Sequence, residues 1–311
     1  MTEPTLHHVD CPDPHGGHRM AWWQWGSAAA PHAIVCVHGL SRQGRDFDVL
    51  ARALLARAAA QGQALRVLCP DVVGRGESDR LQDPAAYVFP TYVADMLALL
   101  AAQQQAAPMA TLDWVGTSMG GVIGLLLAGT PGLPLPAPVG RLVLNDVGPR
   151  IEWAALARIG QYLGHQGPFA SVEEGAASLR QTAQAFGPHT DAEWLALSRP
   201  MLRPHPDGGW HLHYDPALAS AYAAVTPEAM AQGEAALWQL YDQLTARVLL
   251  LRGAESDLLS PATAQAMTER GPRAQLAEFA HVGHAPTLVA AEQVRTVLDF
   301  LLPASPARGL A

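Results

Sequence analysis

Short apolar runs that alternate with helix-like segments constrain the fold of this chain most strongly. Residues 32–39 (HAIVCVHG) and 64–71 (ALRVLCPD) are largely apolar, which is typical of strands buried on both faces. Strands that alternate with helices predict an α/β fold with a doubly wound, mostly parallel sheet. The predicted strands are 20–26, 32–39, 64–71, 110–116, 141–148, 246–257 and 273–284, and the predicted helices are 46–62, 90–105, 119–129, 261–271 and 287–302.

The alternation of strands and helices stops after residue 148. Residues 149–235 contain helical periodicities and many alanines but no convincing buried strand. We therefore predict a core formed by residues 1–148 and 236–311, with residues 149–235 as a helical insertion. A chain of 311 residues is long enough for this arrangement. The C-terminal residues 303–311 are expected to be disordered.

Composition excludes several classes of partner. The net charge is −8, and the chain has no basic stripe of the kind that a nucleic-acid-binding protein needs. Gly, Pro or charged residues interrupt the apolar runs well before about 20 residues, so neither a membrane-spanning helix nor a membrane partner is expected. The N-terminus lacks the basic and apolar regions of a signal peptide, and we therefore expect a cytoplasmic protein.

The cysteines and the N-terminal histidines do not form a recognisable metal or disulfide pattern. Three cysteines, Cys11, Cys36 and Cys69, are too few for a disulfide framework. Potential metal ligands near the N-terminus lack the paired spacing of a zinc site, so no functional metal is predicted. These residues are His7, His8, Cys11, His15 and His18.

The sequence GTSMGG, residues 116–121, joins a predicted strand to a predicted helix. Glycines at positions 116 and 120 remove the Cβ atoms that would clash in a sharp turn. Such a turn projects the side chain of Ser118 outward and points the N-terminus of the following helix at its oxygen. An ordinary glycine-rich turn would have the same pattern, so the nucleophile interpretation depends on partners elsewhere in the chain.

Candidate partners for a nucleophilic serine lie further along the chain. A serine hydroxyl needs a base, and His284 is a better candidate than His281 because it follows a glycine in a loop beyond the strand. The imidazole needs a carboxylate to fix its tautomer. Asp257 is the preferred acid, since the order Ser, Asp, His is typical of such sheets. Asp146 is the alternative acid, unless it caps a helix or tethers the insertion, and Glu255 is a weaker choice.

Residues that follow the strand 32–39 are predicted to lie at the same edge of the sheet as Ser118. The amide of Leu40 is a candidate donor to an oxyanion, together with the amide of Met119. The nearby residues that we expect to contact substrate are His38, Gly39, Ser41 and Arg42.

The segment 70–79 (PDVVGRGESD) contains a short glycine pattern. It lacks the glycine and lysine spacing of a phosphate-binding loop. We therefore interpret it as a tight loop held by pairing among Asp71, Arg75 and Glu77.

Five motifs in their usual order resemble the α/β-hydrolase fold family over residues 20–303. They are HG at the end of the strand 32–39, the loop 70–79, GTSMGG, SD at residues 256–257 and GHAP at residues 283–286. The resemblance implies a helical cap over the pocket, inserted after the sixth strand of that fold. It also implies that Ser118 is the nucleophile, Asp257 the acid and His284 the base, with the amides of Leu40 and Met119 as the oxyanion hole.

The same resemblance narrows the chemistry. Haloalkane dehalogenases and epoxide hydrolases of this fold have aspartate where this chain has Ser118. Meta-cleavage product hydrolases commonly have tryptophan after the histidine, where this chain has Ala285. The chain looks more like carboxylesterases and enol-lactonases, which implies a serine hydrolase that cleaves ester or lactone bonds of small, partly apolar substrates without a cofactor. The alternatives are a C–C bond hydrolase, an acyltransferase or perhydrolase with the same triad, and a non-catalytic binding protein.

Side chains of the predicted cap suggest the kind of substrate. Trp153, Ile159 and Tyr162 are candidate substrate contacts, although apolar residues of this kind often only pack a cap onto its core. An apolar cap indicates an apolar acyl or alcohol group. The expected partner is a small-molecule ester or lactone, and the oligomeric state is left open.

Overall fold

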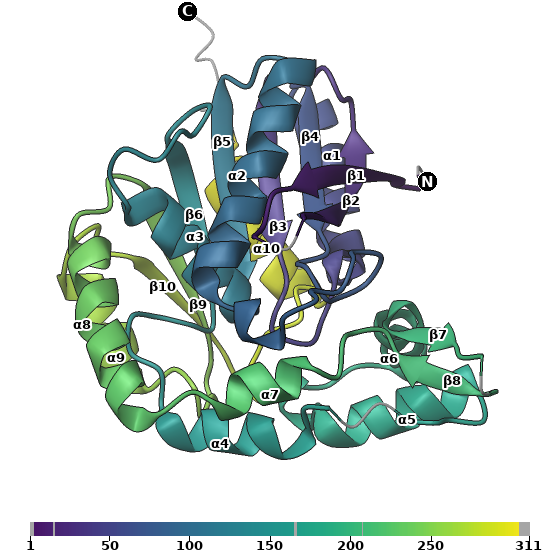
Figure 1. Cartoon of the computed structure of the whole chain (residues 1–311). Coiled ribbons are helices and arrows are strands. Elements are labelled where there is room, and N and C mark those ends of the chain that lie inside the picture. The colour runs from purple at the N-terminus through teal and green to yellow at the C-terminus, as the bar shows by residue number, and fades with distance from the viewer. Residues whose placement is uncertain (1–2, 15, 165–166, 207, 305–311) are drawn as a thin grey trace, which may run out of the picture.

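An eight-stranded sheet forms the centre of the molecule in a computed structural model that describes residues 3–14, 16–164, 167–206 and 208–304. The strand order is β1-β2-β4-β3-β5-β6-β9-β10, and the strands from β4 to β10 in this order are parallel. The predicted doubly wound, mostly parallel sheet is therefore confirmed (Figure 1). The strands are β1 (Thr5–Cys11), β2 (His18–Gly26), β3 (His32–Val37), β4 (Leu65–Pro70), β5 (Thr111–Thr117), β6 (Val139–Asn145), β9 (Arg247–Gly253) and β10 (Gln275–Phe279).

Strand β1 was not among the predicted strands. It pairs antiparallel with β2 at the edge of the sheet, and most of its side chains are exposed or half-buried. Because His7, His8 and Asp10 lie in it, β1 has no apolar run that would mark it as a strand.

Helices cover both faces of the sheet. On one face, α1 and α10 pack their apolar stripes against the strands, for example through Leu50 and Leu54 of α1, which are four residues apart. The other face is covered by α2, α3 and α9. The bounds of these helices are α1 (Asp48–Ala60), α2 (Phe89–Ala106), α3 (Met119–Gly129), α9 (Pro261–Glu269) and α10 (Ala291–Leu301).

Most of the residues between β6 and β9 form a layer across one end of the sheet, at the bottom of Figure 1. The predicted boundary at residue 235 lies inside α8, which also packs against α3 of the core. A short pair of antiparallel strands in this segment was not predicted. The elements are α4 (Trp153–Tyr162), α5 (Val172–Thr182), α6 (Asp191–Ser198), β7 (Leu202–Pro204), β8 (Trp210–Leu212), α7 (Leu218–Ala223) and α8 (Pro227–Asp242).

Hydrogen bonds join this inserted segment to the loop that follows β4. The amide of Asp215 donates to the carbonyl of Gly74 at 2.7 Å, and the amide of Gly76 donates to the carbonyl of His213 at 2.9 Å. The hydroxyl of Tyr87 donates to the Asp215 carboxylate at 2.6 Å. The loop after β4 is thus held between the sheet and the insertion.

Two further predictions concern membrane-spanning helices and the C-terminal tail. Of the helices within the described residues, none combines the length and the apolar content that crossing a bilayer requires. The predicted disordered tail, residues 303–311, lies outside the described residues from position 305 onward.

Candidate active site

Ser118 lies on a sharp turn between β5 and α3. Its φ and ψ of 51° and −116° are in a region that L-residues rarely adopt. A Cβ atom on Gly116 would overlap the backbone of Gly120, and a Cβ atom on Gly120 would overlap the carbonyl of Val37. Glycine is therefore required at both positions for the backbone to turn and present the serine hydroxyl.

His284 bridges Ser118 and a carboxylate. Its Nε2 atom lies 2.9 Å from Ser118 Oγ, and its Nδ1 atom lies 2.8 Å from Asp146 Oδ2. The rival His281 has a side chain that is 85% exposed and lies beside Glu255. An Nδ1–H that donates to a carboxylate leaves Nε2 free to accept the serine proton, which is the arrangement that activates a nucleophile.

The carboxylate beside His284 is that of Asp146, and the expectation that Asp257 would contact this histidine is wrong. Asp257 has a 46% exposed side chain and forms an ion pair with Arg158 of α4, at 2.7 and 2.9 Å. These hydrogen bonds to Arg158 outweigh the effect of partial burial and lower the pKa of Asp257. Asp257 thus lies beyond the end of β9, on the side of the inserted segment.

Asp146 is held by groups at and just after the end of the neighbouring strand β9. It is fully buried directly after β6, and its carboxylate accepts from the amide of Gly253 at 2.9 Å and from the hydroxyl of Ser256 at 2.6 Å. Its own amide donates to the carbonyl of Leu251 at 2.8 Å. These contacts fix the carboxylate toward His284, so Asp146 neither caps a helix nor serves only as a tether. Ser256 was noted from the sequence only as part of the SD motif, and its hydrogen bond to Asp146 was not predicted.

The two backbone amides predicted to bind an oxyanion belong to residues close to Ser118. Met119 is the first residue of α3, so its N–H has no acceptor within the helix and lies at the positive end of the helix dipole. Leu40 lies in a turn in which the amide of Arg42 donates to the carbonyl of Gly39 at 3.1 Å. Leu40 and Ser118 line the same cavity.

A fully buried guanidinium lies behind these two residues. Arg75 donates to the carbonyls of Leu40 and Val73, each at 2.7 Å, and contacts the sulfur of Met119 at 3.5 Å. Within the described residues, no carboxylate lies within 4 Å of Arg75. The predicted pairing among Asp71, Arg75 and Glu77 is thus wrong: the carboxylate of Asp71 accepts instead from backbone amides, including that of Glu77.

His38 does not face the site, contrary to expectation. It is fully buried, and its Nε2 atom accepts from the amide of Val72 at 2.9 Å while its Nδ1 atom lies 2.7 Å from the carbonyl of Gly39. Burial lowers the pKa of His38 to about 3, so the ring is neutral at physiological pH. His38 therefore connects the end of β3 to the loop after β4 and does not contact a substrate.

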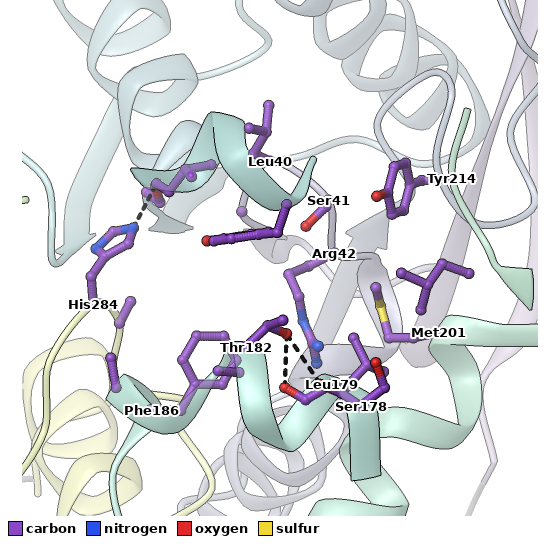
Figure 2. A pocket seen from close by; sticks show the side chains of 18 of the residues that line it. Leu40, Ser41, Arg42, Ser178, Leu179, Thr182, Phe186, Met201, Tyr214 and His284 are labelled. Carbon is purple, nitrogen blue, oxygen red and sulfur yellow. Dashed lines mark hydrogen bonds between the residues drawn. The ribbon is translucent and has the colours of Figure 1, made fainter. Parts of the chain in front are cut away.

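Two cavities meet at Ser118. The first, which we call the polar cavity, has a volume of about 410 Å³ and is lined by Ser118 and His284 (Figure 2). The second, which we call the apolar cavity, has a volume of about 610 Å³ and is lined by Ser118 and Met119. Of the expected substrate contacts, Gly39, Ser41, Arg42, Ile159 and Tyr162 line the polar cavity, whereas Trp153 lines the apolar cavity.

Among the residues that the structure describes, one group of potential metal ligands lies away from Ser118. Cys11, His18 and Asp95 are buried, with ligand atoms within 4.8 Å of one another. The His18 ring, however, lies 3.0 Å from Asp95 and 2.8 Å from Asp13. Burial lowers the pKa of His18, but these hydrogen bonds outweigh it and raise the pKa to about 9. His18 is thus an ion-pair partner of Asp13 and Asp95 in this structure. Of the other potential ligands named from the sequence, for which no functional metal was predicted, His15 lies outside the described residues.

The charge on His18 predicts how stability depends on pH. A histidine whose pKa rises from 6.5 to about 9 on folding stabilises the native state fully below pH 6.5 and loses this contribution as the pH rises through 9. We expect the melting temperature to fall by several degrees over this range. Thermal unfolding of wild type and His18→Gln checks this, because the variant should show a smaller fall. Equal falls would contradict the prediction.

Known proteins resemble this chain in sequence. A model of the alpha/beta hydrolase family matches residues 34–297. The chain is 46% identical over 300 residues to a Cupriavidus necator protein named 3-hydroxybutyrate-oligomer hydrolase, with 96% of this chain and 97% of the relative covered.

Solved structures show the same similarity. An alpha/beta hydrolase from Novosphingobium aromaticivorans is 30% identical with a TM-score of 0.79, and the match covers 98% of this chain and 100% of that one. An esterase from a Rhodococcus species shares the fold at 18% identity and a TM-score of 0.65, with 95% and 98% covered. The resemblance carried by the sequence motifs is thus confirmed. This chain belongs to the alpha/beta hydrolase family and is an enzyme of the hydrolase class.

Proposed function

We propose that this enzyme is a serine esterase that cleaves short oligomers of 3-hydroxybutyrate through an acyl-enzyme. The observation that carries the proposal is the chain of hydrogen bonds from Ser118 through His284 to Asp146, at a turn that opens onto two cavities. A 3-hydroxybutyrate oligomer is a linear polyester, and the relative named for its hydrolysis is 46% identical to this chain.

Formation of the acyl-enzyme begins with transfer of the Ser118 proton to Nε2 of His284. The serine oxygen then attacks the ester carbonyl. The buried carboxylate of Asp146 stabilises the imidazolium that forms and keeps its Nδ1–H in place. The amides of Leu40 and Met119 donate to the developing oxyanion. When the tetrahedral intermediate collapses, the ester C–O bond breaks and His284 returns the proton to the leaving alkoxide.

Hydrolysis of the acyl-enzyme repeats these steps with water. Neutral His284 removes a proton from the water molecule, and the hydroxide attacks the acyl carbonyl in the same oxyanion site. Collapse breaks the bond to Ser118, which takes back the proton from His284. The products are a shorter alcohol-terminated fragment and a carboxylic acid, and no cofactor takes part.

The inserted segment forms part of the cavity walls, and the side chains that it contributes suit the proposed substrate. Ile159 and Tyr162 of α4 and Leu179 and Thr182 of α5 line the polar cavity, so we propose that residues 149–235 act as a cap. Apolar side chains suit the methyl and methylene groups of a hydroxyalkanoate, and hydroxyl groups suit its ester carbonyls.

A substrate panel tests the proposed function. Purified enzyme is incubated with the 3-hydroxybutyrate dimer, trimer and tetramer, a γ-lactone and a vinylogous 1,5-diketone, and the products are quantified by chromatography. We expect the oligomers to be hydrolysed with the highest kcat/KM. A fluorophosphonate probe should label the enzyme once, and peptide mass spectrometry should locate the label at Ser118. Faster turnover of the diketone, or labelling at a different residue, would contradict the proposal.

A further inference from the structure

The apolar cavity runs away from Ser118 along helix α3. Met119, Val122 and Leu126 line it, and their spacing places them on one face of the helix. Because an α-helix rises 1.5 Å per residue, Leu126 lies about 12 Å along α3 from Ser118. Leu237 and Leu240 of α8 form part of the opposite wall. The cavity is thus deep enough for an extended chain attached at Ser118.

The rim of the apolar cavity exposes large apolar side chains. Phe89, Trp153 and Val225 line the cavity and are 37%, 42% and 40% exposed. They come from three different parts of the chain, at the start of α2, the start of α4 and the loop before α8. Exposed apolar groups gathered around an opening mark a place where an apolar ligand enters or leaves.

Charge distinguishes the two cavities. Arg42 and Arg158 line the polar cavity, and none of the described residues that line it is acidic, since the carboxylates paired with these arginines, Asp46 and Asp257, lie outside the lining. The apolar cavity is lined by two carboxylates, Glu152 and Glu234, and by Arg150, which lies 3.5 Å from Glu152. An anionic end group is therefore attracted more strongly to the polar cavity than to the apolar one.

Because both cavities meet at Ser118, each of them can bind one side of the ester bond that is cleaved. In a 3-hydroxybutyrate oligomer, the acyl side of each ester continues toward a neutral hydroxyl end, and the alcohol side continues toward a carboxylate end. We propose that the apolar cavity is the acyl site, which binds the neutral arm, and that the carboxylate arm leaves from the polar cavity. An extended unit with four backbone bonds spans about 5 Å, so about two units fit along α3. This assignment rests on the proposed esterase function.

Two substitutions in opposite walls test the acyl site. Gly233 of α8 lines the apolar cavity, and a Cβ atom at this position would lie in open space, so Gly233→Trp narrows the cavity without a clash at the backbone. Leu126→Trp narrows it from α3. The matched control is Ala235→Trp, which adds the same side chain to an exposed position of α8 that lines neither cavity.

The measurement is the ratio of kcat/KM for p-nitrophenyl octanoate to that for p-nitrophenyl acetate. We expect Gly233→Trp and Leu126→Trp to lower this ratio at least tenfold and Ala235→Trp to leave it unchanged. Leu179→Trp, in the wall of the polar cavity, should change both rates alike because the leaving group is the same. An unchanged ratio in both cavity variants, or a lowered ratio only in Leu179→Trp, would overturn the assignment.

The orientation of the oligomer is tested at Arg158. Arg158→Gln should raise KM several-fold for the free-acid trimer and leave KM for its methyl ester unchanged, since only the free acid carries the anionic end. Equal effects on both trimers would overturn the proposed orientation. Failure of wild-type enzyme to hydrolyse any of these esters would instead contradict the esterase function, so the two failures are distinguishable.

Discussion

Asp146→Asn is expected to lower kcat about 10⁴-fold, whereas Asp257→Asn should change it less than about threefold. Asp146 is fully buried and accepts from His284 Nδ1 at 2.8 Å. An asparagine amide can donate to Nδ1, which places the proton on Nε2 and removes the base that Ser118 needs. Asp257 is half exposed and paired with Arg158, so its loss leaves the hydrogen bonds between Ser118, His284 and Asp146 intact.

Steady-state kinetics on a p-nitrophenyl ester compares the two variants, with melting temperatures as the control for folding. Asparagine at position 146 keeps one oxygen that can accept from the amide of Gly253, so the variant is expected to fold. A large loss in Asp257→Asn together with a small loss in Asp146→Asn would reverse the roles that the geometry supports.

The serine turn could be predicted from the sequence because the backbone of such a turn has no room for a Cβ atom at two positions, which must therefore be glycine. Both Gly116 and Gly120 lie where a Cβ atom would overlap the backbone. The contact between Ser118 and His284 was also predictable, since both follow strands at the same edge of the sheet. In both cases the residue type, its place after a strand and the presence of partners elsewhere in the chain pointed to the same assignment.

The choice of carboxylate could not be made from the sequence. Asp146 and Asp257 both lie between Ser118 and His284 in the chain, and both follow strands that prove to be neighbours, so the order Ser, Asp, His fits either. The difference is local. Asp146 comes directly after β6, whereas Asp257 is four residues past Gly253, the end of β9, where the chain has already turned toward the insertion.

The sequence also does not determine which polar side chains near the strand ends are buried. His38 and Arg75 are polar residues near the carboxyl ends of strands, and position alone predicts that such residues face the site or pair with acids. The structure turns both inward, where backbone groups of the neighbouring loops bind them. Which way a polar side chain turns at a strand end depends on the loop packed against it, and that loop is distant in sequence.

The second large effect is expected at Arg75. Its guanidinium is buried against backbone carbonyls and two tyrosine rings, with centroids at 5.8 Å for Tyr87 and 5.1 Å for Tyr92. Among the described residues no carboxylate lies beside this buried cation, so its positive electrostatic potential decreases slowly with distance. Because Arg75 contacts the carbonyl of Leu40 and the sulfur of Met119, we expect this potential to act on an oxyanion at the two amides that we propose as the oxyanion hole.

Arg75→Met should therefore lower kcat about 100-fold with a smaller change in KM. Arg75→Lys should recover part of this loss, because lysine restores the positive charge but not the several N–H donors of the planar guanidinium. Affinity for a boronic acid, which forms a tetrahedral adduct with the serine, should fall in parallel with kcat/KM across the two variants, because both report stabilisation of the oxyanion. A purely structural role predicts a different result, namely a lower melting temperature and less active protein but unchanged boronate affinity per active site. Titration of active sites with a fluorophosphonate separates the two, since it counts the correctly folded molecules to which each rate and affinity is referred.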